Sequence, residues 1–212
     1  SILTITIFLM YTLALAQDFE EVEIVTTQVS EHIFMLEGIG GNIGVCLGED
    51  GPILIDDQYA PLSQKIKDAV GKITDQSVAF VINTHFHHDH SGGNEVFGET
   101  AHIIAHENAR KRILDYEWDQ VEQGNQEEVK QSALPVLVFN DDMTVYQNAM
   151  EIELIYTTHA HTDGDIAVYF KEENVIHMGD LYVQYGWPFV DMMKGGNVLG
   201  RVNGSYSYCD RR

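Results

Sequence analysis

Positive charge is scarce in this sequence. Lysine and arginine supply 12 residues against 33 aspartates and glutamates, and the formal net charge is -21. Surfaces that bind phosphate need clustered Lys and Arg, so we expect no nucleic-acid partner and no attraction to anionic membranes. We expect the acidity to favour solubility, and a specific acidic recognition surface is the alternative.

Cysteine is scarce too. Cys46 falls in an apparent strand and Cys209 lies near the end of the sequence, and neither has CxxC or CxxH spacing. Neither is therefore a candidate metal ligand on spacing. An exported protein could join the two, but nothing in the sequence brings them together. We expect Cys46 to be a buried thiol.

A hydrophobic run long enough for an ordinary membrane span is also lacking. Residues 1–16, SILTITIFLMYTLALA, carry no charge and have the length of a signal-peptide core. The run ends in a small-x-small cleavage pattern, Ala14-Leu15-Ala16, although a basic leader and a starting methionine are missing. We predict a signal-peptide remnant over 1–16 and export, to a periplasm, with no membrane anchor after cleavage. A buried strand over LTITIF is the alternative.

The rest of the chain, 17–212, has the length and apolar content of one domain. Alternating apolar segments bounded by turn residues predict strands, and apolar positions at helical spacing predict helices. The strands are expected at 22–29, 32–38, 42–48, 52–57, 77–83, 101–106, 134–139, 143–148, 150–157, 165–170 and 174–180. The helices are expected at 62–73, 94–97 and 107–123. This order predicts an α/β fold, an αββα sandwich of two mixed β-sheets flanked by helices.

The most distinctive segment is 83–94, NTHFHHDHSGGN. It directly follows the continuous apolar run SVAFVIN, so we expect it to form the loop beyond a buried strand, where α/β architectures place ligands. A turn can point His85 and His87 at one ion, and Asp89 and His90 at a neighbouring point. An isolated HxH is weak evidence, whereas HxHxDH after a buried strand is strong.

Two further candidate ligands follow other predicted strands. His161 lies in YTTHAHTDGD after MEIELIYT, and Asp180 lies in VIHMGD. A catalytic zinc commonly has three protein ligands and one position for water. His85, His87 and His161 would satisfy this pattern, while Asp89, His90 and Asp180 would make most of a second site.

This combination resembles the metallo-β-lactamase superfamily over about residues 22–200. The matching motifs are THFHHDH, HTDGD and the GD that ends at Asp180, and Asp56 in ILIDD resembles the family's structural aspartate. The resemblance implies two Zn²⁺ ions, with Asp180 bridging them. It further implies a zinc-dependent hydrolase in which metal-bound hydroxide attacks a carbonyl. Asp89 would be the catalytic residue that holds the water and shuttles its proton.

The expected substrate is a small molecule with an ester, thioester, lactone or β-lactam carbonyl. In the best-known lactamase subclass a cysteine stands in place of Asp180, which favours the wider hydrolases, although other lactamases also lack that cysteine. A true β-lactamase is therefore one alternative. An iron-dependent oxidoreductase resembling the persulfide dioxygenases is another.

One departure from the family concerns its last histidine, which binds the second metal. No histidine follows His177 in this sequence. We expect the C-terminal part of the domain to be missing and the second metal to bind weakly. An inactive metal-binding fragment is therefore a third alternative.

The remaining histidines and aromatic residues carry weaker signals. We expect His88 to point away from the metals, and His159 to be exposed or to support a ligand rather than to form an HxH pair. Tyr182, Tyr185 and Trp187 could line the pocket mouth, but core packing is the expectation for such a cluster. We expect ordinary structural roles for His32, His102, His106 and His177.

Overall fold

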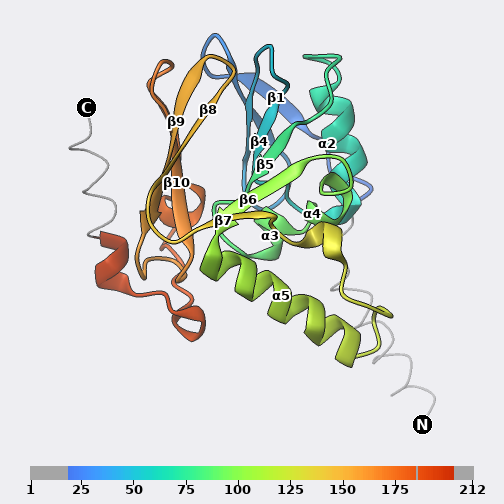
Figure 1. The fold of residues 1–212 in the computed structure, drawn as a ribbon, viewed down its shortest axis with the longest axis vertical. Helices are drawn as coiled ribbons and strands as arrows, with labels where there is room; N and C mark the ends of the chain where they lie inside the picture. The colour runs from blue at the N-terminus through green and yellow to red at the C-terminus, as the bar shows by residue number, and fades with distance from the viewer. Residues whose placement is uncertain (1–18, 185, 203–212) are drawn as a thin grey trace.

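The computed structural model describes residues 19–184 and 186–202. Within this part of the chain two β-sheets pack face to face (Figure 1). The α/β sandwich of two sheets with flanking helices is thereby confirmed. The predicted signal-peptide remnant, Tyr185 and Cys209 lie outside the described residues.

The larger sheet contains β1 to β7 in chain order. The strands are β1 Val25–Gln28, β2 Ile33–Glu37, β3 Ile43–Cys46, β4 Ile53–Ile55, β5 Phe80–Ile82, β6 His102–His106 and β7 Leu137–Phe139. Pairs from β1 to β4 are antiparallel, and pairs from β4 to β7 are parallel. The sheet is therefore mixed, as expected.

Parallel neighbours need crossover connections, and helices supply them. The helices are α2 Ser63–Val70 between β4 and β5, α3 His88–Ser91 and α4 Asn94–Phe97 between β5 and β6, and α5 Glu107–Glu122 between β6 and β7. Short 3₁₀ turns are η1 Ala60–Leu62, η2 Gln131–Ala133, η3 Gly179–Leu181 and η4 Met192–Lys194. No helix among the described residues is long and apolar enough to cross a membrane.

The smaller sheet has the order β11-β10-β9-β8. Its strands are β8 Met143–Gln147, β9 Met150–Thr157, β10 Asp165–Phe170 and β11 Val175–His177. All its pairs are antiparallel within the described residues, whereas we expected a mixed sheet. Short reversals such as the β8–β9 turn allow this arrangement without a crossover helix.

The main hydrophobic core lies between the two sheets. Alternate residues of the larger sheet, including Ile55 and Ile82, pack against Leu154, Ile166 and Val168 of the smaller sheet. A second core fills the space between the larger sheet and α2, so both faces of the central strands are buried. This explains the continuous apolar runs that predicted these strands.

The apolar spacing within 107–123 predicts a buried face with Ile113, Tyr116 and Val121, and the observed face of α5 differs at one position. Ile113 is buried as expected, but Tyr116 is 38% exposed and Glu117 is only 6% exposed. The Glu117 carboxylate accepts hydrogen bonds from Gln126 Nε2 and from the backbone N–H of Lys130, at 2.7 and 3.1 Å. These partners compensate the cost of burying a charged group.

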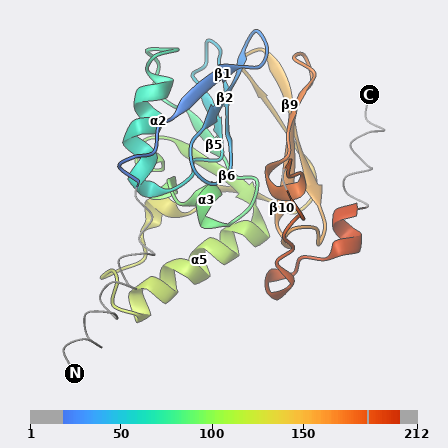
Figure 2. The ribbon, with the colours of Figure 1, turned by 180° about the vertical axis from the view of Figure 1, so that it is seen from behind.

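One end of the sandwich gathers the segments that carry the candidate ligands. The segments after β4, β5, β9 and β11 all leave the sheets at this end, because β9 and β11 run in the same direction on either side of β10. Figure 2 shows the segment with η3 and η4 beside α3 and α5 at this end. Segments that are distant in the sequence therefore converge at this end of the sandwich.

Candidate metal centre

The histidine-rich segment is partly helical. After β5 ends at Ile82, the chain runs to His87 and then forms the single turn α3, with backbone N–H groups of His90 and Ser91 bonded to the His87 carbonyl at 2.9 and 3.0 Å. Asp89 and His90 thus lie on a helical turn, whereas we expected a loop. The turn points His85 and His90 inward, and both are 1% exposed.

Three histidine nitrogens meet at one point. His87 Nδ1 lies 3.1 Å from His85 Nε2 and 2.9 Å from His161 Nε2. The opposite nitrogen of two of these rings faces an oxygen: His87 Nε2 lies 3.0 Å from Asp191 Oδ2, and His161 Nδ1 lies 2.9 Å from the Phe189 carbonyl. A carbonyl or carboxylate oxygen accepts a hydrogen bond, so these outer nitrogens carry the protons.

The outer nitrogen of His85 also faces an oxygen, which in this case belongs to a hydroxyl group. His85 Nδ1 lies 3.1 Å from Thr84 Oγ1, and that hydroxyl donates to Asp56 Oδ2 at 2.7 Å. The Thr84 oxygen must therefore accept from His85 Nδ1–H. In the neutral rings, the inner nitrogens of His85, His87 and His161 all present lone pairs toward one another.

Facing lone pairs cannot form hydrogen bonds among themselves, so this arrangement fits a cation. Nitrogens bound to one tetrahedral Zn²⁺ lie about 3.3 Å apart, close to the spacing observed here. Burial, reinforced by the neighbouring histidines, holds the pKa of His85 well below its usual value. Burial also lowers the pKa of His161. Both rings are thereby kept neutral, which is the form that binds metal.

A second group of candidate ligands, formed by Asp89, His90 and Asp180, lies directly beside the first group, formed by His85, His87 and His161. Asp180 Oδ1 lies 3.2 Å from His90 Nε2, and Asp180 Oδ2 lies 3.4 Å from His161 Nε2. Asp89 Oδ2 is 3.6 Å from His90 Nε2. Burial favours the neutral carboxyl of Asp180, but His90 and His161 outweigh it and lower its pKa to about 2. Asp180 is therefore ionised, and its carboxylate lies between His90 of the second group and His161 of the first.

Four of the candidate ligands have donor atoms close enough together to bind one metal ion. Ligand atoms of His85, His87, His161 and Asp180 all lie within 4.8 Å of one another. The buried His90 Nε2 faces the carboxylate oxygens of Asp180 and Asp89, at 3.2 and 3.6 Å. The donor set of nitrogens and carboxylate oxygens suits zinc.

Asp56 supports both groups from behind. Its carboxylate accepts from Thr84 N–H, Thr84 Oγ1–H and His90 Nδ1–H, each at 2.7 Å. Asp56 is fully buried. Its φ of 65° is a left-handed backbone conformation, which is costly for residues other than glycine. The structure places it where the resemblance to the family put the structural aspartate.

The weaker candidates lie outside this cluster. The His88 ring packs against Tyr116, with 4.7 Å between centroids, and points away from the ligand atoms. His159 is exposed and bonds the Gly195 carbonyl at 2.9 Å, so it forms no HxH pair with His161. Trp187 is 98% exposed and Tyr182 is 64% exposed, so the expectation of core packing was wrong for these two.

Asp191 was missed by sequence analysis. It bonds His87 across 104 positions of the sequence, and no spacing rule relates the two. Thr84 was also missed as a partner of His85, although it is the preceding residue. Its only sequence signal was its place between a buried strand and the first histidine.

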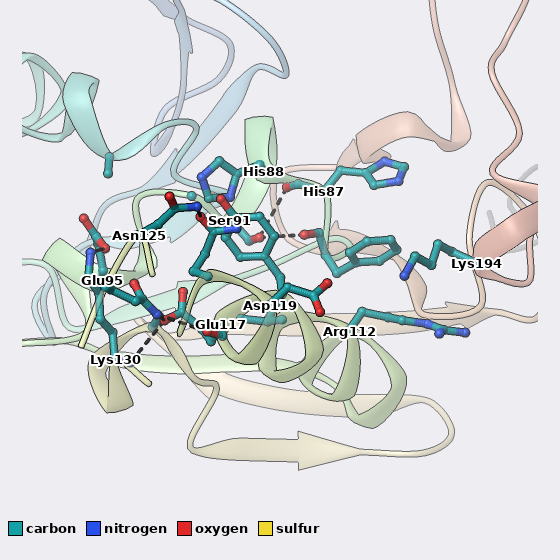
Figure 3. A pocket seen from close by; sticks show the side chains of 18 residues that line it. His87, His88, Ser91, Glu95, Arg112, Glu117, Asp119, Asn125, Lys130 and Lys194 are labelled. Carbon is teal, nitrogen blue, oxygen red and sulfur yellow. Dashed lines mark hydrogen bonds and ion pairs between the residues drawn. The ribbon is translucent and has the colours of Figure 1, made fainter. Parts of the chain in front are cut away.

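A cavity of about 480 Å³ reaches the candidate centre at His87, which is the one candidate ligand among its lining residues (Figure 3). It lies between the His87–Gly92 turn and α5, and the figure shows His88 and Ser91 on one side and Arg112 and Glu117 on the other. Its size falls within the range of small-molecule pockets.

The family profile described as the metallo-beta-lactamase superfamily matches residues 39–206, which include all six candidate ligands. The chain belongs to the metallo-β-lactamase superfamily. The match covers most of the sequence and includes β3 to β7 of the larger sheet and all four strands of the smaller one.

Solved structures with the same fold include a metallo-β-lactamase from Pontibacter korlensis, 14% identical, with 89% of this chain and 87% of that chain covered at a TM-score of 0.67. A metallo-β-lactamase from Legionella gormanii is 15% identical, with 88% and 75% covered at 0.64. A subclass B3 metallo-β-lactamase of Bradyrhizobium japonicum is 17% identical, with 92% and 76% covered at 0.64. At identities this low, the TM-scores show a shared fold alone.

Proposed function

We propose that the protein is a metal-dependent hydrolase that cleaves a carbonyl group in a small-molecule ester, thioester, lactone or β-lactam. The observation that carries the proposal is the meeting of three inner histidine nitrogens beside the Asp180 carboxylate. Export to a periplasm, argued from residues 1–16, belongs to the same proposal.

His85, His87 and His161 would hold a first Zn²⁺, and Asp89 and His90 a second, with Asp180 contacting both. When bound, Zn²⁺ lowers the pKa of a coordinated water to about 7 and polarises a carbonyl oxygen. The lowered pKa of His85 and His161 supports this assignment, because protons then compete weakly with the metal.

Asp89 is the residue that handles the proton. Its side chain is 31% exposed beside the buried His90 ring, so water and a substrate can reach it. It accepts a hydrogen bond from the attacking water at a carboxylate oxygen, takes the proton there and delivers it to the leaving oxygen, sulfur or nitrogen. One water is consumed, the bond from carbonyl carbon to leaving atom breaks, and an acid is released.

The test is turnover of a carbonyl panel by protein loaded with Zn²⁺. The panel contains nitrocefin, an acyl thioester, a lactone and an aryl ester. We expect turnover of at least one substrate, its loss on chelation and its recovery on adding Zn²⁺. Asp89→Asn should reduce kcat by roughly 10²–10⁴-fold, the usual contribution of general acid–base catalysis. Asp115→Asn, on the exposed side of α5, is the charge-matched control and should leave kcat unchanged.

The alternatives give different outcomes. Turnover of nitrocefin alone would identify a β-lactamase within the proposed class. Oxygen consumption with a persulfide by protein loaded with Fe²⁺, without hydrolysis by the zinc form, would replace the proposal with an oxidoreductase. Tight metal binding with no turnover of any panel member would contradict catalysis and leave a metal-binding protein.

A further inference from the structure

We propose that Asp191 is a positioning residue that fixes the ring and the tautomer of His87 for the first metal. This inference rests on the proposed metal site, and it goes beyond the six residues assigned as ligands. The relevant segment, residues 187–197, follows η3 and includes η4, and it is called the clamp segment below.

The contact between Asp191 and His87 is short and partly shielded from water. Asp191 Oδ2 lies 3.0 Å from His87 Nε2, and the two side chains are 17% and 21% exposed. A hydrogen bond to a carboxylate is stronger than one between neutral groups. It keeps the proton on Nε2, so Nδ1 stays free to bind metal, and it increases the basicity of the ring.

Asp191 is itself held in place from several directions. Its Oδ1 accepts from the Lys194 backbone N–H at 3.1 Å, which caps η4. Its own N–H donates to the His161 carbonyl at 2.8 Å, and its carbonyl accepts from Gly196 N–H at 2.8 Å. Because both carboxylate oxygens and both backbone groups are engaged, the side chain that reaches His87 has little freedom.

The clamp segment also orients a second ligand. The Phe189 carbonyl accepts from His161 Nδ1 and from Arg201 Nη1, each at 2.9 Å. The Phe189 ring centroid lies 5.8 Å from that of His161 and 6.3 Å from that of His87. One short segment therefore contacts the outer side of two of the three histidines in the first set.

The remaining histidines depend on a different support. His85 and His90 are oriented through Thr84 and Asp56, which follow β5 and β4 of the larger sheet. Within residues 19–184 and 186–202, neither Thr84 nor Asp56 hydrogen-bonds His87, although His87 shares the segment that follows β5. Asp191 supplies the carboxylate that Asp56 supplies to His90. Losing it should loosen His87 while leaving the Asp56 side of the centre intact.

The test compares Asp191→Ala and Asp191→Asn with the control Asp115→Ala. Competition with a chromophoric chelator gives the affinity for Zn²⁺ at the first site. Loss of a supporting hydrogen bond of this kind typically reduces metal affinity by roughly 10–100-fold, and we expect this for Asp191→Ala. Asp191→Asn should fall between the wild type and Asp191→Ala, because an amide oxygen still accepts from Nε2–H but has no charge. Asp115→Ala should match the wild type.

Two spectroscopic readouts separate positioning from simple support of the fold. Long-range ¹H–¹⁵N spectra of the metal-free protein should show His87 protonated at Nε2 in the wild type and a mixture of tautomers in Asp191→Ala. The visible absorption of the Co²⁺ form should change in Asp191→Ala and remain unchanged in the control.

Unchanged affinity, tautomer and Co²⁺ spectrum in Asp191→Ala would overturn the proposal, whether or not its melting temperature falls. A wild type that binds no metal would overturn it as well. A wild type that binds metal but hydrolyses nothing contradicts the proposed function alone, because none of these readouts depends on turnover.

Discussion

Two adjacent aspartates behind the metal centre show how environment decides the role of a residue. The Asp56 carboxylate receives three hydrogen bonds and orients Thr84 and His90. Asp57 is equally buried, but its Oδ1 accepts only from Gly93 N–H, and its Oδ2 has no partner among the described residues. Burial and the neighbouring Asp56 raise the pKa of Asp57 well above its usual value. The folded environment therefore favours the neutral carboxyl of Asp57.

This state makes stability depend on pH. An unfolded aspartate loses its proton near pH 4, whereas folded Asp57 retains it to higher pH. Its favourable contribution is therefore complete below about pH 4 and is lost as pH rises through the folded pKa. Asp57→Asn stays neutral and keeps an acceptor for Gly93. We expect the free energy of unfolding of the variant, relative to the wild type, to increase between pH 4 and pH 7.

Urea unfolding of the metal-free proteins at both pH values checks this prediction. Comparing the change with pH cancels any effect of the substitution that does not depend on protonation. A difference between variant and wild type that is the same at pH 4 and pH 7 would show that Asp57 is not held neutral.

At the scale of elements, the turn between β2 and β3 closes over the second group of ligands. A Cβ on Gly41 would overlap the His90 ring, and one on Gly40 would overlap Asp89. Gly40 also has a φ of 86°, which favours glycine. The glycines in GIGGN thus let the backbone approach the ligands closely.

Gly41→Ala should displace His90 and weaken the second metal site more than the first. Stepwise titration with Zn²⁺ should show a larger loss of affinity in the weaker step, because the three atoms nearest to a Cβ on Gly41 all belong to the His90 ring. Gly71→Ala at the end of α2 is the matched control, since its nearest atom to a new Cβ is at 3.3 Å and its φ is -63°. Equal weakening of both steps, or of neither, would contradict this account of the turn.

Local patterns were enough to predict most elements, because strands buried on one or both faces have characteristic apolar spacing. The same patterns could not place Glu117 rather than Tyr116 in the buried face of α5, since Gln126 and Lys130 of the following loop decide it. The ligand segment was readable because its donors are neighbours in the sequence. Asp191 was not, because its contact with His87 exists only after the two sheets pack.

At the scale of the whole molecule, the candidate metal centre joins the two sheets. His85, His87 and His90 follow β5 of the larger sheet, whereas His161 and Asp180 follow β9 and β11 of the smaller one. Packing of the core between the sheets therefore sets the distances among the ligands. The central claim is that these residues bind metal as one centre.

Zinc content per chain tests this claim most directly. It is measured by mass spectrometry after equilibration with Zn²⁺ and dialysis, in the wild type, His85→Ala and Asp180→Ala. We predict one firmly held zinc in the wild type and additional zinc at higher free Zn²⁺. His85→Ala should lose the firmly held ion, and Asp180→Ala should mainly lose the additional one. Zinc content in His85→Ala equal to that of the wild type would contradict the account.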